Sequence, residues 1–146
     1  MAGETIKDYG AWVDLATSGG SISNNAFVAA TAANFSLATD GGNRPHLEFE
    51  AELTFGTAPT ANTAVVLHHA PLSTFSGSDA RDPSSTNMGG SLSIMSVDSV
   101  TTAQRFRFNV LNAPGNSKYW LQNSNTGQSI SAGWKLRARA WTLKPA

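Results

Sequence analysis

The chain has 146 residues, with ten basic and ten acidic side chains and no cysteine. A chain of this length forms one domain with an ordinary hydrophobic core, so residues 1–146 are predicted to be a single unit. The lack of cysteine excludes disulfides, thiolate zinc sites and thiol nucleophiles. A formal net charge of zero disfavours general nucleic-acid binding, which needs a cationic excess.

Membrane insertion and secretion also lack support in the sequence. The longest apolar run, Ala26 to Ala30, has five residues, against the roughly 20 that span a bilayer. The start Met1-Ala2-Gly3-Glu4 resembles no secretory signal, so synthesis in the cytosol is expected. Only 14% of residues are charged, which is typical of β-sheet faces, turns and surfaces that other subunits cover.

The first predicted elements are short strands separated by glycine- and asparagine-rich turns. We expect the strands at Tyr9 to Leu15, Ala26 to Ala29 and Phe35 to Ala38. A helix is an alternative only in the alanine-rich stretch 26–33. Gly and Asn tolerate positive φ, so turns are predicted at 18–20, 40–43, 113–115 and 125–127.

A long amphipathic strand is predicted at Pro45 to Phe55. Side chains on a strand point to opposite faces with period two, so alternating apolar and polar residues give it a buried and a wet face. The buried face comprises Leu47, Phe49, Ala51, Leu53 and Phe55, and the wet face comprises His46, Glu48, Glu50, Glu52 and Thr54.

Short strands at Ala64 to His69 and Leu92 to Val97 flank a long segment, 71–90, without a strand pattern. A loop of this length is usually functional or disordered. It is either a mobile surface excursion or an arm that orders against a partner through Leu72, Phe75 and Met88. Residues Met1 to Asp8 are a possible second arm.

Three strands complete the chain, at Gln104 to Val110, Lys118 to Gln122 and Trp134 to Ala140. The first and third alternate strictly and place basic residues on their wet faces: Arg105 and Arg107 on one, and Lys135, Arg137 and Arg139 on the other. Trp141 and Leu143 then break this phase, which predicts a bulge or a terminal segment covered on both faces.

These strands predict an all-β fold, a two-sheet antiparallel β-sandwich with jelly-roll topology. An immunoglobulin-like or galactose-binding-like sandwich is the alternative.

The three glutamates of the strand 45–55 form an acidic ladder, which opposite charges on a neighbouring strand would stabilise. We therefore expect Glu48, Glu50 and Glu52 to pair with one of the two basic ladders, within the chain or between subunits. A glycosidase-like acid pair would need one carboxyl with a raised pKa, and three equivalent carboxylates do not suggest it. The sequence thus predicts no catalytic residue.

Metal and cofactor binding also lack a pattern. His68 and His69 are adjacent in a strand and point to opposite faces, and His46 is isolated. The stretch Asp79 to Asp82 lacks the spacing of a calcium loop. Neither a GxSxG elbow nor a phosphate-binding GxxxxGK[ST] motif is present. We expect no metal site and no cofactor.

The aromatic residues allow two interpretations. The set Trp12, Trp120, Trp134, Trp141, Tyr9 and Tyr119 packs in a core, or exposes two or three rings as a sugar-stacking platform. Tyr119 and Trp120 must lie on opposite faces of their strand.

Four segments give the chain a resemblance to small virion proteins of tailed bacteriophages: 12–20 (WVDLATSGG), the strand Leu47 to Phe55, 118–123 (KYWLQN) and 131–136 (SAGWKL). It is most similar to a capsid decoration, or cement, protein. The resemblance implies a β-sandwich or jelly roll, a trimer at capsid symmetry axes, and bridging of neighbouring major capsid subunits on the outer surface of the virion. The alternative is a carbohydrate-binding module or the receptor-binding tip of a phage tail or fibre.

Overall fold

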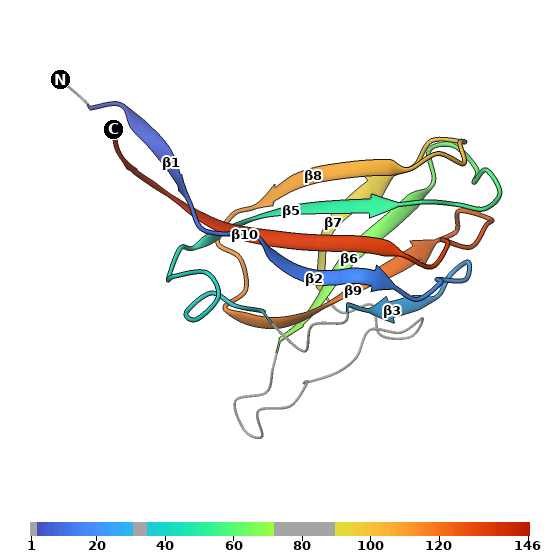
Figure 1. Cartoon of the computed structure of the whole chain (residues 1–146), viewed down its shortest axis with the longest axis horizontal. Helices are drawn as coiled ribbons and strands as arrows, with labels where there is room; N and C mark the ends of the chain where they lie inside the picture. The colour runs from blue at the N-terminus through green and yellow to red at the C-terminus, as the bar shows by residue number, and fades with distance from the viewer. Residues whose placement is uncertain (1–2, 31–34, 72–89) are drawn as a thin grey trace.

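The computed structural model describes residues 3–30, 35–71 and 90–146, which form two antiparallel sheets packed face to face (Figure 1). These residues contain ten strands and no helix, and so no helix that could cross a membrane. Leu72, Phe75, Met88 and the stretch Asp79 to Asp82 lie outside the described residues.

The first sheet, called the front sheet, has the order β2, β10, β5, β8, and β1 pairs with the far end of β10. Its strands are β1 (Thr5–Tyr9), β2 (Val13–Gly19), β5 (His46–Leu53), β8 (Gln104–Val110) and β10 (Trp134–Pro145). The back sheet is ordered β3, β9, β6, β7, with β4 also paired to β9. Its strands are β3 (Phe27–Ala29), β4 (Phe35–Ser36), β6 (Ala64–Pro71), β7 (Gly90–Ser96) and β9 (Asn116–Ser124).

The order of strands within the two sheets is that of a jelly roll. After β2 the chain crosses to β3 and β4, returns to β5, forms the hairpin β6–β7 in the back sheet, and then places β8, β9 and β10 alternately in front and behind. This connectivity is a pair of Greek keys wrapped across two sheets. The predicted fold class and topology are confirmed.

The core lies between the sheets and contains the apolar faces that the sequence predicts. Leu47, Phe49, Ala51 and Leu53 of β5 are at most 1% exposed. On β10 the inward set Trp134, Leu136, Ala138 and Ala140 is likewise buried. Leu67 and Leu121 are fully buried residues of the back sheet that belong to the same cluster.

The predicted strand Tyr9 to Leu15 is two strands, which corrects the sequence analysis. From Tyr9 to Val13 the chain advances four residues while its partner β10 advances three, from Trp141 to Ala138. The extra residue interrupts the ladder at 10–12 and turns the ring of Trp12 over the outer face of the front sheet. The alternation pattern could not locate this irregularity.

The expected break in phase after Ala140 is wrong. β10 keeps its register with β5 through Trp141 and with β1 through Pro145. Trp141 therefore points outward like Arg139, and it is 5% exposed because the ammonium group of Lys7 and the ring of His46 cover it at 4.3 and 4.5 Å. Leu143, two residues further on, is 56% exposed, so the terminal segment is not covered on both faces.

Turn residues behave as their chemistry requires. Asn43 and Gly42 adopt positive φ in the turn at 40–43, and Asn125 and Gly127 do so in the turn at 125–127. Gly19 has a different role, because the indole of Trp134 lies where its side chain would be. Trp134 is 2% exposed and donates from Nε1 to the carbonyl of Gly20 at 2.7 Å.

Replacing Gly19 with alanine should therefore destabilise the protein. A Cβ atom would displace the buried indole, and overpacking of this kind costs about 1–3 kcal/mol. Gly20→Ala is the matched control, because a Cβ atom at that position would have no neighbour within 4 Å beyond the adjoining residues. Urea unfolding of both variants measures the difference, and equal midpoints would show that the close contact has no energetic role.

Candidate functional site

The outer face of the front sheet holds the acidic ladder between both basic ladders. Strand β5 lies between β8 and β10, so each glutamate has neighbours on two sides. Glu50 is opposite Arg107 on β8 and Arg137 on β10. Glu52 is opposite Arg105 and Lys135 in the same way. The expectation that the acidic ladder pairs with a basic ladder is confirmed, but it pairs with two instead of one.

Ion pairs connect the three strands row by row. Glu50 binds Arg107 through Nε at 3.0 Å and Arg137 through Nη2 at 2.7 Å. Glu52 accepts from Arg105 at 2.7 Å and lies 3.5 Å from the ammonium nitrogen of Lys135.

Glu48 occupies the most enclosed row. It accepts from Arg139 at 2.7 Å, lies 3.6 Å from Arg107, and has a side chain only 6% exposed. Each carboxylate is shared by two cations, and Arg107 also joins the rows of Glu48 and Glu50; the three rows together are called the lattice.

An aromatic ring covers part of this lattice. The ring centroid of Trp12 lies 4.4, 4.6 and 5.7 Å from the guanidinium carbons of Arg137, Arg139 and Arg107. The ring centroid of Tyr9 lies 3.7 Å from the guanidinium carbon of Arg139. Guanidinium groups are attracted to aromatic faces, so the two rings hold the arginines against the sheet and reduce their contact with water.

Ion pairing in the lattice favours the ionised forms of Glu50 and Glu52. The hydrogen bond from Arg107 lowers the pKa of Glu50 below its ordinary value of 4.5, and the hydrogen bond from Arg105 lowers the pKa of Glu52 in the same way. A general acid in glycoside hydrolysis needs the opposite shift. Glu50 and Glu52 therefore cannot hold a proton for transfer near neutral pH.

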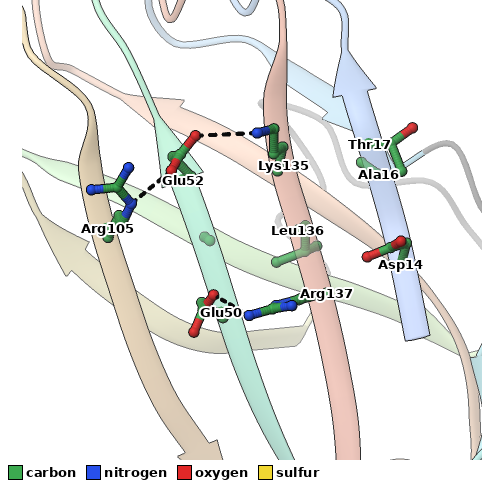
Figure 2. Close-up of a pocket in the computed structure, with 10 residues that line it drawn as sticks. Asp14, Ala16, Thr17, Glu50, Glu52, Arg105, Lys135, Leu136 and Arg137 are labelled. Atoms are coloured by element: carbon green, nitrogen blue, oxygen red, sulfur yellow. Dashed lines mark hydrogen bonds and ion pairs between the residues drawn. The ribbon is translucent and has the colours of Figure 1, made fainter. Parts of the chain in front are cut away.

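A partly open pocket of about 340 Å³ lies beside the lattice, between β2 and β8 (Figure 2). Its charged lining residues are three acids and three bases, Asp14, Glu50, Glu52, Arg105, Lys135 and Arg137. The dashed contacts in Figure 2 show that all of these except Asp14 bind one another. The charged residues that line the pocket therefore sum to zero formal charge, and five of the six are already engaged in ion pairs.

The histidines do not converge on one site. His68 and His69 point to opposite faces of β6, as predicted. His68 is opposite Trp120 of β9, which points outward, and His69 is opposite Tyr119, which points into the core. His68 is buried and contacts Gln122 at 2.9 Å, whereas His46 lies in the front sheet. Burial lowers the pKa of His69, and nearby His68 adds to this shift. Among the described residues, no three His, Asp or Glu side chains are placed to share a metal ion.

The aromatic residues divide as predicted for Tyr119 and Trp120. Tyr119 is 1% exposed and packs edge-on against Phe49, and burial raises the pKa of its hydroxyl. Trp120 points outward and lies 5.2 Å from the ammonium nitrogen of Lys118. Trp134 and Trp141 are buried. Of the four tryptophans only Trp12 and Trp120 are half-exposed, and they lie on opposite sheets.

A second feature is a ribbon that projects beyond the sandwich. β1 and the end of β10, residues 141–145, form a two-stranded ribbon that carries both described chain ends away from the sheets (Figure 1). The possible arm at Met1 to Asp8 thus includes part of a strand. The ribbon is anchored near its base by Asp8, which accepts from Arg44 at 3.0 Å and Lys144 at 2.8 Å.

Exposed apolar side chains gather at this end of the molecule. Ile6, Tyr9 and Leu143 on the ribbon are 46%, 38% and 56% exposed. Leu111 follows β8 and is 65% exposed; the next residue, Asn112, donates to Nδ1 of His46, which packs against Trp141 at the base of the ribbon. Four of the six large apolar side chains exposed in the described part of the chain therefore lie at this end, with Ile6 on the opposite face of the ribbon from Tyr9 and Leu143. Exposed apolar side chains gathered in this way are suited to contact with another protein.

Sequence reasoning found the lattice but missed this surface. The alternation of charges identified every member of the lattice. Ile6 stands singly between polar residues and Leu111 follows Val110 at the end of a strand, so no period or motif distinguishes them. Leu143 was the available signal, because an apolar residue at an outward position of β10 must be covered by something or exposed.

Comparisons with known proteins give little further guidance. No protein-family model matches the chain, and a search of curated proteins finds no significant match.

Three solved structures are similar in outline. The C-terminal CBM6 of the laminarinase LamC from Zobellia galactanivorans has 13% identity and a TM-score of 0.43, covering 97% of this chain and 99% of the other. A structure of infectious bursal disease virus, strain Gx, has 13% identity and a TM-score of 0.40, covering 97% and 32%. A family 35 carbohydrate-binding module from an environmental isolate has 12% identity and a TM-score of 0.27, covering 92% and 77%. At such scores the likeness supports no assignment of function.

Neutralising Glu50 should weaken the lattice. Glu50→Gln removes the charge that Arg107 and Arg137 share, and we expect a loss of roughly 1 kcal/mol in the free energy of unfolding at neutral pH. Asp14→Asn is the matched control, because Asp14 lines the same pocket but lies outside the ion-pair lattice. Chemical denaturation measures both, and equal losses would show that ion pairing is unimportant at this face.

The same pair of proteins gives a pH test. The folded-state pKa of Glu50 is depressed, so its contribution is complete above 4.5 and is lost as the pH falls through the lowered value. The difference in stability between wild type and Glu50→Gln should therefore shrink in acid. A difference that stayed constant through that range would contradict the assignment.

Proposed function

We propose that this chain is a non-enzymatic structural protein of a tailed-bacteriophage virion, which decorates the outer capsid surface as a homo-oligomer and bridges major capsid subunits. The observation that carries the proposal is the terminal ribbon. Its side chains Ile6, Tyr9 and Leu143 are exposed in the described part of the chain, and the ribbon itself projects from the sheets (Figure 1). A protein with this feature is suited to working through contacts with other proteins.

The lattice supports a role in which the outer face carries no reactive group. Each of its three carboxylates is bound by two basic side chains, and the lowered pKa of Glu50 keeps that side chain ionised. A carboxylate that is ionised and ion-paired in this way provides no proton donor. The resemblance of the sequence to decoration proteins names the assembly in which such a protein would act.

The proposed mechanism is stapling. Each copy would bind across a joint between capsid subunits, so separating those subunits also requires breaking the decoration contacts. Attachment of one copy in an oligomer raises the effective concentration of the others, which strengthens binding without new contacts. A trimer at a capsid symmetry axis is the arrangement that the resemblance implies.

The proposal predicts that the purified protein protects capsids. Particles of the virus that encodes the chain, stripped of it, should rupture at a lower temperature than intact virions. Adding the protein back should restore heat resistance and saturate at a fixed ratio to the major capsid protein. Light scattering during a temperature ramp measures rupture, and an unchanged rupture temperature after stripping would refute the stapling role.

Carbohydrate binding is the alternative function, and the tryptophan positions weigh against a platform. Trp141 is buried, so it cannot stack on a sugar as the sequence allowed, and Trp12 and Trp120 lie on different sheets. A glycan array with the wild type, Trp12→Ala and Trp120→Ala should show no specific glycan. A signal lost in one of these variants would favour the alternative over the decoration role.

A further inference from the structure

Within the described residues, β1 pairs with β10 on one side only, which leaves its outer edge open to another strand. Gly10 N–H donates to the carbonyl of Ala140 at 2.7 Å, and Ala146 N–H to that of Glu4 at 2.8 Å. Hydrogen-bonded pairs alternate along an antiparallel ladder, so Ile6 and Asp8 also direct their N–H and C=O groups toward β10. The backbone groups of Thr5, Lys7 and Tyr9 therefore point away from the ribbon.

The ribbon depends on few contacts of its own. Pairing between β10 and β5 ends at Trp141 and His46, so from residue 142 onward only β1 pairs with β10. Two-stranded ribbons are marginally stable in water. Asp8 joins the ribbon to Arg44, whereas its contact with Lys144, which is opposite Ile6, stays within the ribbon. A third strand at the open edge would stabilise the ribbon and cover its apolar side chains.

The opposite edge of the front sheet offers a matching surface. β8 keeps a regular register with β5 from Gln104 to Val110, and in the described part of the chain its outer edge is unpaired. Phe106, Phe108 and Val110 are only half-buried along that edge, and exposed Leu111 follows them.

The other sheet edges are less suited to pairing. β2 is interrupted by register shifts, β3 and β4 have three and two residues, and the pairing of β7 with β6 is irregular at Leu67 and His68. Short or bulged edges disfavour strand addition. β8 is therefore the regular edge that could accept a strand.

We propose that the ribbon of one copy adds, through the open edge of β1, to the β8 edge of a second copy. The partner is a second copy because one chain carries both halves of the contact. These halves lie on opposite edges of the same sheet and at the same end of the molecule. The contact is head-to-tail, and such contacts form a ring when the rotation closes. Ile6 and Leu143 point to opposite faces of the ribbon, so one of the two would pack near Leu111 of the neighbour.

This inference deepens the proposed function by naming the partner of the ribbon, and proline substitution tests it. Lys7→Pro deletes an N–H that points to the open edge and leaves the bonds to β10 in place, since proline is tolerated on edge strands. Lys7→Ala is the matched control for loss of the Lys7–Trp141 contact. Light scattering after gel filtration should show oligomers for wild type and Lys7→Ala, and monomers for Lys7→Pro.

The receiving edge is tested by Leu111→Asp, which should also give monomers. Its control is Ile94→Asp, because Ile94 is 71% exposed but lies on the back sheet. Circular dichroism and thermal melting of every variant show whether the sandwich remains folded. A folded Leu111→Asp oligomer would overturn the inference.

A mixture of the two broken variants is the decisive measurement. Lys7→Pro retains an intact β8 edge and Leu111→Asp retains an intact ribbon, so a head-to-tail contact predicts a one-to-one dimer from two monomeric proteins. Two ribbons that pair with each other would give no such rescue, and this result would overturn the inference. So would a wild-type protein that is monomeric at its highest soluble concentration.

The two proposals fail in different ways. A monomer that still protects stripped capsids would refute head-to-tail assembly and leave the decoration role intact. Oligomers that form as expected but do not alter capsid rupture would refute the decoration role alone. If Lys7→Pro stays oligomeric but no longer binds capsids, the ribbon contacts the capsid protein, and a second copy is not its partner.

Discussion

Backbone pairing along both edges of β10 is the constraint on which the rest of the structure depends. Its first half is held between β2 and β5 inside the front sheet, and its second half continues outward with β1. The same strand therefore supplies core side chains, such as Trp134 and Leu136, and the basic ladder on the opposite face. Because the strand alternates without interruption, the inner and outer chemistry of the molecule are fixed by one register.

That register also explains how much the sequence could predict. Glu48, Glu50 and Glu52 alternate with Leu47, Phe49 and Ala51, so a single period identified the buried face, the charged face and the need for basic partners. The partners on both sides could not be predicted, because strand order depends on long-range connections that no local pattern encodes. The break at 10–12 escaped for a related reason: it comes from a mismatch in length between two paired strands, whereas a pattern records only one of them.

The exposed apolar side chains at the ribbon end of the molecule show what the sequence could not predict. A buried face needs several apolar residues in phase, and this repetition is what makes a core readable. The exposed residues Ile6, Leu111 and Leu143 come from three places in the chain, and only the fold brings them to one end. Trp141 is an instructive intermediate case. Its outward position suggested an irregular strand, but Lys7 and His46 cover the ring without any change in the backbone.

The continuity of β10 from ribbon to sandwich has a mechanical consequence. A force applied at the ribbon runs along the strand axis into the middle of the front sheet, where the hydrogen bonds to β5 lie perpendicular to the strand. Those bonds, and the ion pairs of the lattice beside them, are then loaded in shear and resist together instead of peeling apart one at a time. A ribbon built in this way would transmit tension to a neighbouring molecule bound to it while the jelly roll stays folded.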